Sequence, residues 1–262
     1  MPIDDFVNQV EKDAKELERD LYDEIMAVVI GLMTINGKTV FNEKNILLVG
    51  RLDKAFVSFD KNFQQPFIKK ISVHLKGLDK FYVDYFNEMG LDARSFKGFN
   101  ALMKSMDDYL NSVSVLNPVK MEVKNYVLSS ISQGRSIGTI RMGLRSILGL
   151  KERSSVLNRY YRTFLYDTIM KFDRMVSNAH AKQNNLKYFE YAGGLIETSR
   201  DFCIKRNGLV FNKDMIADWI LDPSLPETPG YVPIVDMGSY SCRHYPLWLS
   251  DLEAKERIEN AK

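Results

Sequence analysis

Long apolar runs, cysteine and histidine are all scarce in this chain of 262 residues. The richest apolar stretch, Ile25 to Met33, is far shorter than the roughly 18 to 20 residues needed to cross a bilayer. The sequence begins with acidic residues where a secretory signal would carry basic ones, so we expect the protein to fold in a cytoplasm. Its two cysteines, Cys203 and Cys242, suit a reducing compartment and exclude a disulfide scaffold.

Proline and glycine are also few, at 8 and 15 residues, which excludes a low-complexity or disordered protein. Hydrophobic residues make up 45% of the chain, enough for one large domain or two modest ones with an apolar core. The net charge of +2 hides an asymmetry. Residues 1–30 hold nine acids and three bases, whereas residues 133–174 hold nine bases and three acids. Such charge separation can orient a molecule between two partners or be neutralised internally.

Apolar residues recur every three or four positions through the first two thirds of the chain, which predicts a succession of helices. The apolar stripe of the first helix broadens after Leu21, so we expect that helix to begin exposed and end buried. Asn36-Gly37 predicts a turn. Further helices are expected from Asn42 onward, over Pro66–Gly90, and over residues 96–110, 117–134, 136–149 and 157–182.

The pattern changes after residue 185. Residues 187–191, KYFEY, are typical of a strand, and two short helices are expected over residues 199–206 and 213–221. Residues 222–246 hold five of the eight prolines and predict an ordered loop before a charged helical tail. The predicted fold is therefore mainly α, a long-helix bundle with a small α+β C-terminal subdomain. We expect an N-terminal helical region over residues 1–117 and a second domain over residues 118–262.

Metal binding is the first chemistry to consider, because Cys203, Cys242 and His244 are all potential ligands. Their spacing is C-x38-C-x-H, whereas a structural zinc site usually takes four ligands, two of them in a close pair such as C-x2-C. We therefore expect no metal and no cofactor, and well under one zinc per chain. On this interpretation the cysteines are small apolar fillers of the C-terminal subdomain, near each other in space.

Catalysis has little support in the sequence. His74 lies beside an apolar stripe and His180 ends the longest predicted helix, so both are expected to be packed or surface residues. A dyad of Cys203 and His244 would need only proximity in space, but no third orienting group or oxyanion-hole motif accompanies it. We expect no catalytic residue and no enzyme.

Phosphate binding has little support either. Gly193-Gly194 lacks the Lys-Ser/Thr of a nucleotide-binding loop. The basic segment 133–174 contains no recognisable DNA-binding motif, and several of its bases lie near Glu152, Asp167 or Asp173, where local pairing is available. We expect no strong binding to duplex DNA; contact with an acidic protein surface fits the segment better.

Six short motifs follow one another between residues 134 and 244. They are Gly134-Arg135-Ser136, Arg159-Tyr160-Tyr161-Arg162-Thr163, KYFEY at 187–191, Thr198-Ser199-Arg200-Asp201-Phe202-Cys203, a Gly208 turn, and Ser241-Cys242-Arg243-His244. This order resembles the phage head-morphogenesis family, the minor head proteins similar to protein F of phage Mu. The resemblance covers residues 123–246. The chain departs from the family pattern at Glu197, where many members have Asp, and no His-Pro precedes Cys242.

The resemblance implies a non-enzymatic minor capsid protein of the virion, which acts in head morphogenesis and in DNA packaging or delivery. Its implied partners are the portal protein, the major capsid protein, or both, with at most weak contact with packaged DNA. No membrane and no small-molecule substrate are implied. Two alternatives stay open: a DNA-binding internal virion protein, and an enzyme or toxin related to proteins in which this family is fused to such domains.

The motif residues are expected to have structural roles: Gly134, Arg162, Thr163, Glu197, Thr198, Arg200, Cys203, Gly208, Cys242 and Arg243. Buried arginines need carboxylate or carbonyl partners. We therefore predict that Arg162, Glu197, Arg200 and Arg243 form a polar clamp. The clamp would fix the C-terminal subdomain to the long helix, with the two cysteines packed beneath it.

Overall fold

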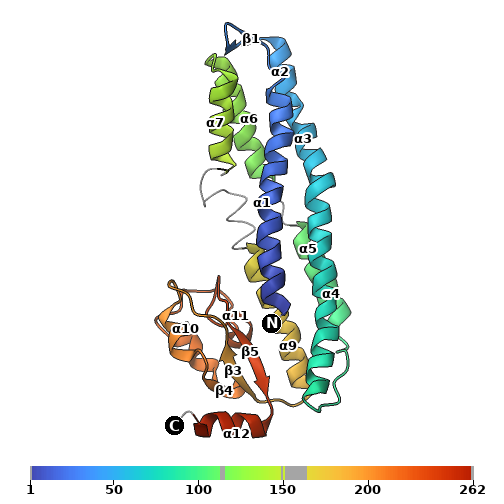
Figure 1. Ribbon diagram of the computed structural model, residues 1–262, viewed down its shortest axis with the longest axis vertical. Coiled ribbons are helices and arrows are strands. Elements are labelled where there is room, and N and C mark those ends of the chain that lie inside the picture. The colour runs from blue at the N-terminus through green and yellow to red at the C-terminus, as the bar shows by residue number, and fades with distance from the viewer. Residues whose placement is uncertain (1, 113–115, 149, 151–163, 261–262) are drawn as a thin grey trace. The chain divides into compact units, whose positions relative to one another are not determined.

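The computed structural model describes residues 2–112, 116–148, 150 and 164–260 (Figure 1). It divides the chain into two compact units. Unit 1 comprises Met1–Ile71 and Asp108–Phe164, and unit 2 comprises Ser72–Asp107 and Leu165–Lys262. The predicted boundary near residue 117 is therefore not the boundary of the structure. The chain leaves unit 1 within one helix and returns to it within the next, so each unit is built from two separate segments.

The described residues of unit 1 form helices and one short hairpin. Its elements are α1 (Pro2–Val29), β1 (Thr34–Ile35), β2 (Lys38–Thr39), α2 (Glu43–Gly50), α3 (Leu52–Phe59), the π-helical turn η1 (Asp60–Gln64), the start of α4 (Gln65–Glu88), α6 (Leu116–Ser132) and α7 (Ile137–Ile147). Asn36 and Gly37 form the hairpin turn with φ of 51° and 75°, as predicted. The expectation of an exposed start to α1 is wrong, because Phe6, Val7 and Val10 are already buried.

Local sequence signals explain where several of these helices begin and how closely they pack. The side chain of Asn42 accepts a hydrogen bond from the Asn45 amide at the start of α2, and Ser136 caps α7 in the same way. Gly143 of α7 lies against Tyr126 of α6, where an added Cβ would fall 1.9 Å from the tyrosine hydroxyl. The close contact of α6 and α7 therefore requires glycine at this position.

Unit 2 combines long helices with a three-stranded antiparallel sheet. Its elements are the rest of α4, α5 (Phe99–Ser112, whose last residues belong to unit 1), α9 (Tyr166–Gln183), β3 (Tyr188–Ala192), α10 (Asp201–Arg206), β4 (Val210–Asn212), the 3-10 turns η3 (Lys213–Met215) and η4 (Ala217–Leu221), α11 (Pro233–Asp236), β5 (Tyr245–Leu249) and α12 (Asp251–Asn260). The sheet order is β4-β3-β5, with β3 in the centre (Figure 1).

The mainly α fold with a small α+β C-terminal part is confirmed. The KYFEY strand is confirmed as β3, whereas the predicted loop over residues 222–246 in fact contains α11 and the start of β5. One face of the sheet packs on α9, where Trp248 donates a hydrogen bond from Nε1 to Ser177 Oγ at 2.9 Å. The rings of Phe189 of β3 and Trp248 are in contact at a tilted angle of 59°, with centroids 5.6 Å apart. None of the described helices is long and apolar enough to cross a membrane.

Candidate functional site

Four buried side chains meet beside β3, and we name Tyr191, Cys203, Cys242 and His244 the cysteine cluster. The two Sγ atoms are 4.0 Å apart, and Cys242 Sγ is 3.7 Å from His244 Nδ1. The Tyr191 hydroxyl donates a hydrogen bond to Cys203 Sγ at 3.3 Å and lies 3.7 Å from Cys242 Sγ. Each of the four residues is at most 3% exposed. The structure thus brings together residues that lie up to 53 positions apart in the sequence.

Three elements position the cluster. Tyr191 lies on β3, which pairs with β5 in the register Tyr191 to Pro246, so His244 enters the site just before β5 begins. Cys203 belongs to the first turn of α10, and Cys242 belongs to the segment between α11 and β5. The main chain of Gly208 completes the support by donating a hydrogen bond to the Tyr191 carbonyl at 2.9 Å.

Two glycines allow the main chain to approach the cluster. An added Cβ at Gly238 would lie 2.3 Å from Cys203 Sγ and 3.0 Å from Cys242 Sγ. Its amide donates to Cys242 Sγ at 3.2 Å. Gly193 has φ of +146°, and a Cβ there would lie 2.9 Å from His244 Cα. Any side chain at either position would displace a member of the cluster.

The backbone around Gly238 is strained. Met237, Ser239 and Ser241 have φ of 50°, 71° and 54°, in the left-handed region that non-glycine residues rarely adopt. Such conformations persist only where the surroundings hold the chain in place. Here the segment is fixed by the buried Met237 side chain and by the contact of Gly238 with both sulfur atoms.

The surroundings shift the pKa values of the two thiols in opposite directions. The pKa of Cys242 is lowered well below its ordinary value, first by the hydrogen bond from Cys203 and then by His244 and the positive charge of Arg174. The same hydrogen bond, together with burial, raises the pKa of Cys203. Burial also raises the pKa of Tyr191. The lower pKa of the pair thus belongs to Cys242 and the higher one to Cys203.

Among the described residues of this subdomain the buried arginine is Arg174 of α9, one of the nine bases of segment 133–174. Its guanidinium donates from Nε to the His244 carbonyl at 2.9 Å, from Nη1 to the Val235 carbonyl at 3.0 Å and from Nη2 to the Cys242 carbonyl at 2.6 Å. The side chain is 1% exposed. Arg174 therefore fixes the main chain of two cluster residues to α9.

The prediction that Arg162, Glu197, Arg200 and Arg243 form a polar clamp is wrong. Glu197 and Arg243 are exposed, and no hydrogen bond or ion pair of the described residues joins them to Arg200. Arg200 is half-buried; it donates to the Gly238 carbonyl at 3.2 Å and covers the Tyr240 ring at 4.5 Å. Arg162 lies outside the described residues. A buried arginine bonded to main-chain carbonyls is present, but this residue is Arg174 and not one of the four predicted clamp residues.

The remaining motif residues have simpler positions. Gly134 ends α6 with φ of +62°, and Gly208 forms the turn before β4 with φ of +78°. Thr198 is exposed in the loop before α10, and Thr163 lies outside the described residues. The two glycines thus have the structural roles that the sequence predicts, at turns that favour the absence of a side chain.

The other two histidines, His74 of α4 and His180 of α9, are not part of the cysteine cluster. His180 of α9 is fully buried, with Nε2 2.8 Å from Asp79 Oδ1, and its ring contacts Tyr82, Phe86 and Phe96. Burial lowers the pKa of the partly buried His74. His180 is therefore a packed histidine, as predicted, held by one carboxylate within an aromatic environment.

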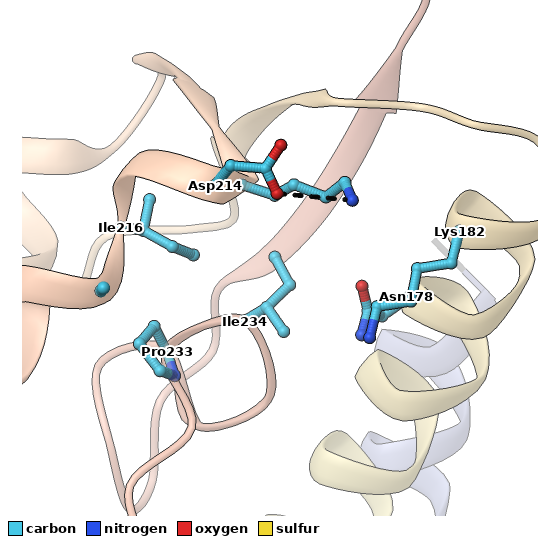
Figure 2. A pocket seen from close by; sticks show the side chains of 8 residues that line it. Asn178, Lys182, Asp214, Ile216, Pro233 and Ile234 are labelled. Atoms are coloured by element: carbon cyan, nitrogen blue, oxygen red, sulfur yellow. Dashed lines mark ion pairs between the residues drawn. The ribbon is translucent and has the colours of Figure 1, made fainter.

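A surface hollow of about 300 Å³ opens in unit 2 next to α9 and α11. Figure 2 shows Asn178 and Lys182 projecting from α9 on one side, with Ile234 of α11 between Asn178 and Pro233. On the other side Lys213 and Asp214 form an ion pair at 3.6 Å. The lining combines scattered amide, ammonium and aliphatic groups. This arrangement does not resemble a set of converging catalytic groups.

Described basic side chains of segment 133–174 interact with other groups of the protein. Arg141 donates to the Tyr22 hydroxyl at 3.0 Å, and Arg145 lies 5.7 Å above the same ring. Lys171 pairs with Asp236 at 2.6 Å. Asp173 accepts a hydrogen bond from Tyr82, and Asp167 accepts one from the Ser241 amide. Burial raises the pKa of Asp167, whereas the nearby charges of Arg174 and Lys171 lower it, in line with the predicted local pairing. The described bases of this segment therefore have both local and distant partners within the protein.

Comparison with known proteins adds no relative: no family model, curated protein or solved structure matches the chain.

Proposed function

We propose that the protein is a non-enzymatic structural and assembly protein of a tailed-phage head. It is a minor capsid protein that associates with the portal protein or the major capsid protein and acts in head morphogenesis and in DNA packaging or delivery. The proposal rests on the ordered motif series between residues 134 and 244, which resembles the head-morphogenesis family.

One structural observation carries the proposal. Three motifs of that series, separated by up to 50 residues of chain, each contribute to the cysteine cluster: KYFEY supplies Tyr191, the Thr-Ser-Arg motif supplies Cys203, and the last motif supplies Cys242 and His244. The Gly208 turn binds the Tyr191 carbonyl. Residues that a family motif selects are expected to share a structural site, and this arrangement agrees with that expectation.

Burial favours a structural role over an enzymatic one. His244 Nδ1 faces Cys242, so the dyad considered from the sequence, with Cys203 as the nucleophile, is not the arrangement found. Both sulfurs and the imidazole are almost fully enclosed. A nucleophile must be reached by its substrate, and here the residues of the cluster instead join β3, α10 and the segment before β5.

The DNA-binding alternative has less support. Phosphate binding needs basic side chains that face solvent together, because each contact neutralises one phosphate. The guanidinium of Arg174 is enclosed, and that of Arg145 lies over the Tyr22 ring. Arg141 is exposed but donates to the Tyr22 hydroxyl, and Lys171 pairs with Asp236, so the described bases do not form one free basic face. Contacts with an assembly partner therefore suit this molecule better than a phosphate-binding face.

Deletion of the gene from the phage or prophage that carries it tests the proposal. We expect cells to make portal and capsid proteins but to release few or no filled, infectious heads, because a morphogenesis protein acts between subunit synthesis and packaging. Electron microscopy of lysates and plaque titres measure the effect. Wild-type protein supplied in trans should restore both. Normal heads and an unchanged titre would contradict the proposal.

A further inference from the structure

We propose that Cys203, Cys242 and His244 bind one zinc ion, with the Tyr191 hydroxyl at the fourth corner of the site. The ligand atoms of the first three residues all lie within 4.8 Å of one another, and this is the one such group of Cys, His, Asp and Glu among the described residues. The inference is independent of the proposed role in a phage head.

Four distances within the cluster lie near those of a tetrahedral zinc site, and the separation of Cys203 and His244 is within 4.8 Å. Zn–S bonds of about 2.3 Å and Zn–N bonds of about 2.0–2.1 Å place two sulfur ligands about 3.8 Å apart, and sulfur and nitrogen about 3.5 Å apart. Here the sulfurs are 4.0 Å apart, and Cys242 Sγ is 3.7 Å from His244 Nδ1. The Tyr191 oxygen is 3.3 and 3.7 Å from the two sulfurs. Small side-chain rotations would bring these ligand atoms to bonding distance from one ion.

The hydrogen bonding of His244 is an independent indication. The residue is 2% exposed, yet its Nε2 has no hydrogen-bond partner among the described groups. Its Nδ1 makes only a long contact with Cys242 Sγ. Buried polar groups are nearly always satisfied, so a buried imidazole with so few partners requires an explanation. A metal ion on Nδ1, the nitrogen that faces Cys242, would give that nitrogen a partner, while Nε2 would stay a donor without an acceptor among the described groups.

The groups around the cluster are those that hold metal ligands in place. The Gly238 amide donates to Cys242 Sγ, and Arg174 binds the main-chain carbonyls of Cys242 and His244. The Tyr191 ring lies 4.7 Å from the imidazole at an angle of 30°, which fixes its orientation. Outer groups of this kind orient the ligands and change metal affinity about 10–100-fold when removed.

The ligand set indicates both the metal and the role. Thiolate and imidazole ligands favour zinc over magnesium, calcium or manganese. Four protein groups would close the coordination sphere, which is typical of a structural rather than a catalytic zinc. The sequence predicted no metal because C-x38-C-x-H lacks a close cysteine pair. The pairing of β3 with β5 and the position of α10 bring the ligands together instead, so sequence spacing was no guide.

Titration of the full-length, reduced protein with Co²⁺ tests the site, because thiolate-bound cobalt gives a charge-transfer absorption and tetrahedral cobalt gives visible d–d bands. We expect saturation at one Co²⁺ per chain and displacement by Zn²⁺. The variants C203S, C242S and H244Q should lose the stoichiometric signal, whereas the control H74Q should keep it. Absence of a saturable thiolate signal in the wild-type protein would overturn the proposal.

A second variant keeps the test decisive where a cysteine variant fails to fold. Tyr191→Phe retains both sulfurs and the imidazole, so we expect it to bind one Co²⁺ with affinity lowered about 10–100-fold and with altered d–d bands. An unchanged affinity and spectrum would remove Tyr191 from the site. Zn²⁺ should also raise the melting temperature of the wild-type protein, since a ligand that binds only the folded state stabilises it. A Cys203–Cys242 disulfide in freshly isolated protein, unaffected by zinc, would overturn the zinc assignment.

Discussion

Replacing Arg174 by methionine should lower the free energy of unfolding by about 3–6 kcal/mol. The guanidinium donates to three main-chain carbonyls, and each buried acceptor left without a donor costs about 1–3 kcal/mol. Methionine keeps most of the aliphatic volume, so the lost hydrogen bonds dominate the effect. Urea denaturation of the wild-type and variant proteins, followed by circular dichroism, measures the difference.

Arg243→Met is the matched control, because Arg243 lies one residue from the cluster but is exposed. Surface substitutions of this kind usually change stability by less than about 0.5 kcal/mol. The two variants should therefore differ by several kcal/mol. Equal, small losses in both would show that Arg174 does not fix the Cys242 and His244 main chain.

Replacing Trp248 by alanine should cost about 3–5 kcal/mol, the usual range for removing a large buried aromatic side chain. Trp248 is 1% exposed, packs at a tilted angle against Phe189 of the central strand and donates a hydrogen bond to Ser177 of α9. Its removal opens a cavity between the sheet and α9 and leaves the Ser177 hydroxyl without this donor. Thermal and urea denaturation both measure the loss.

Leu221→Ala gives the comparison for this variant. Leu221 ends η4 in the same subdomain and is 76% exposed, so its truncation should change stability by less than about 0.5 kcal/mol. If Trp248→Ala were as mild as this control, the packing of the sheet on α9 would not stabilise the subdomain.

Local signals in the sequence were enough to predict much of the fold. Asn42 and Ser136 cap helices where the sequence places them, and the Asn36-Gly37 turn has the expected left-handed conformation. Strand β5 was missed because Pro246 lies within it and proline disfavours central strands. The sheet order places β5 at an edge, where a proline is tolerated. The edge position of β5 follows from its pairing with β3, which the sequence alone does not indicate.

The site was harder to predict, because it depends on contacts between distant segments. The sequence placed the two cysteines near each other in one subdomain, and their sulfurs are in contact distance. The clamp failed because burial was assigned to Arg200 and Arg243 from their motifs. A usable signal existed at Arg174, which shares a helix face with the buried residues Met170, Ser177 and Ala181 at positions i−4, i+3 and i+7.

The composition of purified heads tests the central claim most directly. If the proposal holds, lysates in which this chain is produced contain procapsids and mature heads, which would be purified and analysed by quantitative mass spectrometry against the major capsid protein, with the free lysate as the control fraction. We predict a fixed, low copy number of this protein in procapsids, heads or both. Its absence from both particles, with all of the protein free in the lysate, would contradict a role as a structural head protein.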